Sequence, residues 1–137
     1  MPEIAERRYA LEAMSAVHRI LVSSKRLATP ELESLIGAPF PDMVKFVVDV
    51  HTRKIAIGGA MHVDAEAELL GAGSQQEHLW GGNYHPGTSP EGCVEYTSLI
   101  NIRPAQGNRS MEVQDPSIRR RMLEIVHKLV GRGEPLA

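Results

Sequence analysis

The alternation of hydrophobic and polar residues between positions 44 and 57 predicts a β-hairpin. In residues 44–50, valine and phenylalanine occupy every second position and share one face, while Lys45 and Asp49 lie on the other. Residues 51–54 are typical of a turn, and residues 55–57 of the returning strand. Because a hairpin is antiparallel by construction, this segment predicts an antiparallel sheet.

A second alternating segment, residues 94–103, predicts another long strand, which the following proline ends. The polar, glycine-rich stretch before it carries two weaker patterns. Residues 74–77 have the form of a capping box and predict one helical turn, and residues 79–84 suit a short strand. Asp64 is expected to cap a short helix over residues 65–70.

Apolar residues at helical spacing mark both ends of the chain. Residues 4–26 predict a long amphipathic helix. A short helix then follows, with Thr29 as its cap, Pro30 in its first turn and Gly37 at its end. The last helix is expected to begin at Asp115. Its apolar stripe consists of Ile118, Met122, Ile125 and Leu129.

These elements predict an α+β fold. We expect a small antiparallel sheet of three or four strands packed with a C-terminal helix, plus an N-terminal helical extension. Residues 1–28 are assigned to that extension, residues 29–132 to a single α+β domain, and residues 133–137 to a tail. The 137 residues are enough for one domain with a hydrophobic core of its own.

Composition narrows the class of protein. Hydrophobic residues make up 42% and charged residues 23%, with a net charge of −2, so the chain is typical of a globular protein and lacks the basic excess of a nucleic-acid binder. The single cysteine, Cys93, cannot form an internal disulfide. No apolar run reaches the roughly 20 residues that span a bilayer, and no signal pattern opens the chain. We therefore expect a cytoplasmic protein that contacts neither membrane nor nucleic acid.

Several polar runs occur in a fixed order between about residues 29 and 131. They read Met-His-Val-Asp at 61–64, Gly-Ser-Gln-Gln-Glu-His-Leu-Trp-Gly at 73–81, Asn-Ile-Arg-Pro at 101–104 and Asn-Arg-Ser-Met at 108–111. With these runs the chain resembles a small, uncharacterised prokaryotic family, a domain of unknown function. The resemblance implies the extent of the domain. It implies no activity and no cofactor.

The first group of candidate residues surrounds His62. His62, Asp64 and Glu66 alternate, and with Glu77 and nearby histidines they supply nitrogen and oxygen ligands, but their spacing matches no defined metal site and we predict none. One interpretation makes His62 a general base, assisted by Asp64 or Glu77. The other is structural, with Asp64 as a helix cap, Glu77 in the capping box and His62 at the end of the sheet.

The second group of candidates gathers arginine and asparagine. Asn101 and Arg103 come near a predicted strand end, and Asn108 and Arg109 follow the next turn. Two guanidinium groups there could grip a carboxylate or phosphate. The structural alternative pairs an arginine with a carboxylate across the sheet and lets Asn108 shape the turn. Trp80, followed by two glycines, suits an apolar wall.

The leading hypothesis is a small-ligand or partner-binding domain with an anion-accepting polar pocket. Its ligand-binding residues would be Trp80, Asn101, Arg103, Asn108 and Arg109, and the ligand a small anion. The first alternative is a hydrolase, with phosphodiesters as the substrate class considered and His62, Asp64 and Glu77 as catalytic residues. The second is a structural or regulatory interaction module that forms a homodimer through the first helix. The two ligand-site hypotheses require distant residues to line one common hollow.

Overall fold

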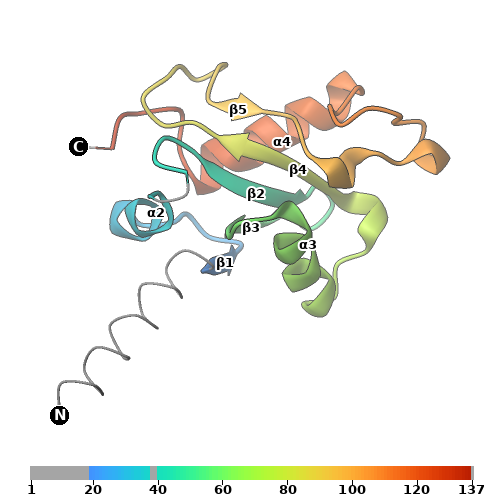
Figure 1. Ribbon diagram of the computed structural model, residues 1–137, viewed down its shortest axis with the longest axis horizontal. Helices are drawn as coiled ribbons and strands as arrows, with labels where there is room; N and C mark the ends of the chain where they lie inside the picture. The colour runs from blue at the N-terminus through green and yellow to red at the C-terminus, as the bar shows by residue number, and fades with distance from the viewer. Residues whose placement is uncertain (1–18, 38–39, 137) are drawn as a thin grey trace, which may run out of the picture.

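The computed structural model describes residues 19–37 and 40–136, which form five strands and three helices (Figure 1). The strands are β1 (Ile20–Ser23), β2 (Val44–Asp49), β3 (Lys54–Gly58), β4 (Leu79–Tyr84) and β5 (Val94–Glu95). The helices are α2 (Thr29–Leu35), α3 (His62–Gly71) and α4 (Pro116–Leu129). Three short 3₁₀ turns lie at Gln76–His78, Leu99–Asn101 and Pro104–Gln106.

The five strands form one antiparallel sheet in the order β1-β3-β2-β4-β5. The predicted α+β class is confirmed, with more strands than the three or four expected. Helix α4 covers one face of the sheet and α3 the other (Figure 1). Among the described residues, no helix combines the length and apolar character needed to cross a membrane.

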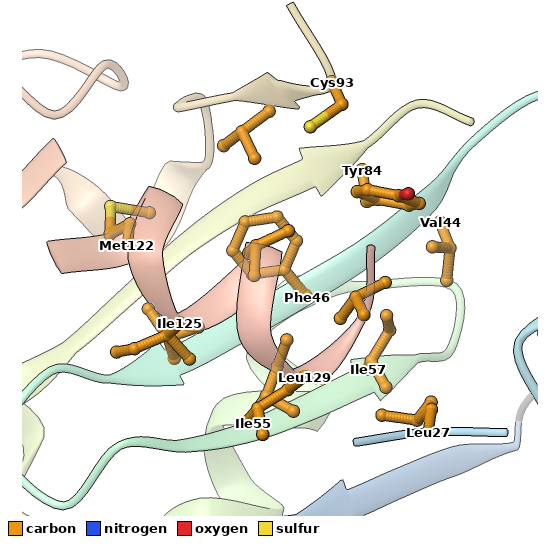
Figure 2. Packing of buried hydrophobic residues seen from close by; sticks show 14 of the residues in the cluster. Leu27, Val44, Phe46, Ile55, Ile57, Tyr84, Cys93, Met122, Ile125 and Leu129 are labelled. Atoms are coloured by element: carbon orange, nitrogen blue, oxygen red, sulfur yellow. The ribbon is translucent and has the colours of Figure 1, made fainter. Parts of the chain in front are cut away.

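Strand alternation divides the core into two layers. On the α4 face, Phe46 and Ile55 pack with Met122, Ile125 and Leu129, so the stripe predicted for the last helix lies against the sheet (Figure 2). The opposite face holds a smaller cluster under α3, formed by Val47, Ala56, Ala65, Leu69 and Leu79. The hairpin therefore buries both of its faces, because each is covered by a helix.

Two predicted elements are wrong. Residues 94–103 form a strand only at Val94–Glu95, after which the chain leaves the sheet. Ile20–Ser23, assigned by periodicity to the first helix, instead form β1 and pair with residues 55–58 of β3. At residues 20–23 tertiary pairing overrides the helical spacing, because the free edge of β3 satisfies the strand's backbone groups. The rest of that predicted helix, apart from its last residues, lies outside the described part of the chain.

The start of α4 agrees with prediction, whereas the starts of α2 and α3 differ from it. Helix α4 begins as predicted, because Asp115 Oδ1 accepts a hydrogen bond of 2.8 Å from the Ser117 amide. Helix α3 begins two residues before Asp64, with Met61 as its N-cap and no side chain capping it. The Ser74 hydroxyl donates to Asp49 Oδ2 at 2.7 Å, so it joins two elements and caps no helix. Helix α2 begins at Thr29, with the residue before it as N-cap.

Candidate functional site

The buried Asn101 side chain substitutes for a missing strand. Strand β5 pairs only with Asn83 and Tyr84, which leaves the outer edge of β4 open at Gly81. Asn101 Oδ1 accepts from the Gly81 amide at 2.9 Å, and Nδ2 donates to the Gly81 carbonyl at 2.9 Å and to the Met111 carbonyl at 3.0 Å. Its amide group thus completes the backbone hydrogen bonding of the sheet edge.

The Arg103 side chain also bonds to a backbone carbonyl at this edge of β4. Its guanidinium group donates to the carbonyls of Leu79 and of Gln76, the latter at 2.8 Å, and Nε donates to the Ile100 carbonyl at 3.1 Å. It lies 4.7 Å from the centroid of the Trp80 ring and 3.6 Å from Glu66 Oε2. Burial lowers the pKa of Arg103, and the nearby Glu66 carboxylate opposes that shift. The cation is held by internal partners.

Asn108 closes the loop that presents these side chains. Its Nδ2 donates to the carbonyls of Asn101, Ser110 and Glu112 at 2.8, 2.9 and 3.0 Å. Its Oδ1 accepts from the Gln114 amide at 2.9 Å. Arg109 is exposed next to it. Asn101, Arg103 and Asn108 are therefore brought together, and their polar atoms bond to the protein itself.

A hollow lies near these elements on the α3 face of the sheet. It encloses about 320 Å³ and is bounded by the start of α3 on one side and residues 97–100 on the other. The residues that line it are Lys45, Ala60, Met61, His62, Val63, Asn83, Thr97, Ser98, Leu99, Ile100 and Met111. We call it the His62 pocket. Of the predicted site residues that the structure describes, His62 is the one that lines it.

His62 is buried at the first position of α3. Its Nε2 lies 2.7 Å from the Gly82 carbonyl oxygen, which can only accept, so Nε2 carries the proton and a neutral ring keeps a lone pair on Nδ1. Burial lowers the pKa of His62, although the hydrogen bond to Gly82 opposes the shift. Asp64 and Glu77 are exposed, and in the described part of the chain His62 is oriented by a carbonyl and by neither carboxylate.

A row of three polar side chains crosses three adjacent strands. Two of them, Lys45 and Asn83, line the His62 pocket, and the third, Glu95, lies next to Asn83. The strand register places Lys45 opposite Asn83, and Asn83 opposite Glu95. Asn83 Nδ2 donates to Glu95 Oε1 at 2.7 Å, whereas Asn83 Oδ1 is buried without a hydrogen-bond partner. Because the Glu95 carboxylate can only accept, the NH₂ group of Asn83 must face it, and this fixes the orientation of the Asn83 amide. The same hydrogen bond is the main cause that lowers the pKa of Glu95.

Large apolar side chains surround the pocket mouth. Leu99 is 70% exposed, Met61 56% and Val63 48%, and Met111 is also exposed. Exposed apolar side chains that gather around a hollow are typical of a binding site, whereas scattered ones need no explanation. Lys45 and Asn83 were not predicted as site residues. Both are polar residues within the strands predicted at 44–50 and 79–84, but only the strand register shows that they are neighbours.

The carboxylates and histidines considered for a metal are dispersed. Glu66 lies beside Arg103, Glu77 Oε1 lies 3.8 Å from His78 Nε2, and His85 Nε2 lies 3.4 Å from Glu95 Oε1. Within residues 19–37 and 40–136, no three or more histidine, cysteine, aspartate or glutamate side chains gather in a group that could hold a metal ion.

The sheet, the two helices that cover it and the His62 pocket define a small α+β domain with an apolar-rimmed hollow at a helix N-terminus. The chain belongs to the family DUF5674, whose members are described as proteins of unknown function. The sequence model of that family matches residues 21–129. The resemblance to an uncharacterised domain family is thereby confirmed. Neither the search of curated proteins nor the search of solved structures gave a match.

Proposed function

We propose that this domain binds a small amphipathic ligand in the His62 pocket. The observation that carries the proposal is Asn83 Oδ1, a buried acceptor without a partner in a side chain that lines the pocket. Leaving such an atom unpaired costs about 1–3 kcal/mol. A ligand with a hydrogen-bond donor would remove that cost, which favours a site shaped for a ligand over an accidental hollow.

Positive potential at the pocket supports a preference for anions. Lys45 lines the floor, with its Nζ 4.9 Å from the centroid of the Phe40 ring. The N-terminus of α3 forms one wall and carries the positive end of the helix dipole. The proposed anion site therefore lies at Lys45 and His62. The predicted site at Arg103 and Arg109 has less support, because Arg103 already bonds to backbone carbonyls.

The size and lining of the pocket support a partly apolar ligand. Its volume of about 320 Å³ falls at the small end of the range of roughly 300–1,000 Å³ that ligand sites occupy. Methionine, valine, leucine and isoleucine make up five of the eleven lining residues. An apolar ligand body would cover the exposed part of that surface.

Backbone amide NMR titration tests this function with three probes of equal chain length. Hexanoate, hexanol and hexylamine are added to the full chain at neutral pH. We expect hexanoate and hexanol both to shift the amide signals of residues 61–63 and 97–100, because Lys45 and the start of α3 attract the carboxylate and the hydroxyl can donate to Asn83 Oδ1. Hexylamine should shift them least, because Lys45 repels its positive charge. If none of the three shifts these signals, the proposed function is refuted.

Two leucines provide a matched pair of variants for the same titration. Leu99→Asp places a charge at the pocket mouth, whereas Leu70→Asp places one on α3 outside the pocket lining. Both side chains are exposed, so both variants should fold. Leu99→Asp should weaken hexanoate binding at least tenfold and Leu70→Asp less than twofold. Equal effects would place the binding outside the His62 pocket.

A second function, hydrolysis with His62 as general base, is supported by one observation. Its ring is held by the Gly82 carbonyl and burial keeps it neutral, so Nδ1 retains a lone pair at the pocket wall. His62→Gln keeps an N–H donor for Gly82 and removes the base. Turnover of p-nitrophenyl acetate or bis(p-nitrophenyl) phosphate should fall at least a hundredfold in this variant. Equal turnover in both proteins, or none in either, contradicts this function.

A further inference from the structure

The wall of the His62 pocket contains a helix start that no side chain caps. Helix α3 has ten residues, and its N-cap is Met61, whose side chain makes no capping hydrogen bond. The first N–H groups of a helix have no partner within the helix and usually bind serine, threonine, aspartate or asparagine oxygens. The Asp64 amide donates to the Met61 carbonyl at 3.2 Å, whereas His62 and Val63 line the pocket, so theirs are the N–H groups at its wall. An oxygen anion is the group that such a helix start accepts.

Whereas the helix start requires an acceptor from the ligand, Asn83 requires a donor. The bond from its Nδ2 to Glu95 fixes Oδ1 as an acceptor, and that atom is buried without a partner in a side chain that is only 7% exposed. The neighbouring His62 ring could donate to it only when protonated, and burial disfavours that form by lowering the pKa of His62. The amide oxygen therefore needs a donor from a ligand, which a simple carboxylate or phosphate lacks at neutral pH. The negative charge of Glu95 behind it also disfavours an anion at this end of the pocket. The two ends of the site thus require different groups.

The sheet register keeps these two requirements close together. Lys45 and Asn83 are directly opposite each other on adjacent antiparallel strands, a position in which β-carbons lie about 4.5–5.5 Å apart. One small polar head can therefore reach the cation and the amide oxygen together. The remainder of the ligand would contact Met61, Val63 and Leu99 at the mouth.

From this arrangement we infer that the ligand is an apolar carboxylic acid with a hydrogen-bond donor on the carbon next to the carboxylate. This inference rests on the proposed binding function and names its ligand class. The carboxylate binds at Lys45 and the start of α3, and the donor binds Asn83 Oδ1. The class contains free 2-hydroxy acids with branched or aromatic side chains. The carboxyl terminus of a peptide that ends in an apolar residue has the same chemistry, with its amide N–H as the donor.

A matched set of probes with one apolar side chain tests the inference by NMR titration of the full chain. Isocaproate has the carboxylate alone, leucic acid adds the 2-hydroxyl, and leucic amide keeps the hydroxyl but lacks the charge. N-acetylglycylleucine represents a peptide terminus. We expect leucic acid to bind at least about fivefold tighter than isocaproate, because it satisfies the buried acceptor. It should bind about tenfold tighter than its amide, because the carboxylate bond is charge-assisted.

Two variants assign these preferences to their residues. In Asn83→Leu the advantage of leucic acid over isocaproate should vanish, and in Lys45→Met the advantage of the acid over the amide should vanish. Lys54→Met, on β3 and outside the pocket lining, is the control and should leave both ratios unchanged. If Asn83→Leu does not fold, the Lys45→Met comparison and the affinity ratios of the wild type still decide whether the inferred ligand class is right.

The outcomes separate the ligand class from the binding function. If isocaproate matches leucic acid, or the amide matches the acid, the inferred class is wrong. If hexanoate shifts the pocket signals but no member of the leucic series does, the class is again wrong and the binding function stands. If no probe of either set binds, both fail. Tighter binding of N-acetylglycylleucine than of leucic acid supports the class and identifies a peptide terminus as its source, and the reverse order identifies a free acid.

Discussion

Asn101→Ala removes the side chain that completes the edge of β4. Asn101 is fully buried and makes hydrogen bonds of 2.9, 2.9 and 3.0 Å to two backbone groups of Gly81 and one of Met111. After the change these three buried groups have no partner, each at a cost of about 1–3 kcal/mol before water relieves part of it. We expect the free energy of unfolding to fall by about 3–5 kcal/mol, a large share of the roughly 5–15 kcal/mol that stabilises a domain.

Asn101→Asp tests which of those hydrogen bonds matters. The aspartate can still accept from the Gly81 amide, but when ionised it cannot donate to the carbonyls of Gly81 and Met111. Burial and the facing carbonyl oxygens raise the folded-state pKa of this aspartate above its unfolded value. The protonated form is then favoured by folding, so the variant is least destabilised below the unfolded pKa. Its deficit relative to the wild type grows as pH rises through the folded pKa.

Urea unfolding followed by the fluorescence of Trp80, the single tryptophan and a buried one, measures both variants. Amide hydrogen exchange at Gly81 reports the edge of β4 directly. Arg109→Ala is the surface control and should change stability by less than about 0.5 kcal/mol. A loss below about 1 kcal/mol in Asn101→Ala, with Gly81 still protected from exchange, would refute the idea that this amide replaces a strand.

Three further changes test other parts of the structure. Gly81→Ala would place a β-carbon 2.8 Å from the Ser98 β-carbon, so we expect a loss of about 1–3 kcal/mol in unfolding measurements. Gly71→Ala, with nothing within 4 Å, is the control and should be neutral or stabilise by up to about 1 kcal/mol. Arg103→Lys loses the planar fork that serves two carbonyls and should cost about 2 kcal/mol by thermal unfolding, and no loss would contradict that role. For Asp49, burial raises the pKa but is outweighed by hydrogen bonds from turn amides and a serine, so the net pKa is lowered. Its stabilisation is present above the unfolded pKa and lost as pH falls through the folded pKa. Asp49→Asn should remove this part of the acid sensitivity in pH-dependent unfolding, and an unchanged pH profile would contradict it.

Local sequence patterns predicted those helices and strands whose alternation or capping residues lie within a few positions of one another. The hairpin at 44–57 and the helix after Asp115 follow from alternation, turn residues and an aspartate cap, and each is confirmed. The long strand at 94–103 is wrong for a specific reason. Its polar residues Asn101 and Arg103 leave the strand path and bond with their side chains to the edge of another strand, β4. Alternation cannot distinguish a side chain that faces solvent from one that replaces a backbone partner.

In the candidate site, too, the sequence indicated some of the residues and the tertiary structure indicated the others. The sequence indicated His62 as a candidate catalytic residue, and it indicated an uncharacterised domain family over about residues 29–131, which the family match at residues 21–129 confirms. It did not indicate that Lys45 and Asn83 share a pocket with His62, because that depends on which strands are neighbours and in what register. Periodicity within about ten residues determines helices and strands, since side-chain direction repeats locally. Only the folded sheet, through pairings between residues far apart in the chain, decided which polar groups meet and that Asn83 Oδ1 is left without a donor.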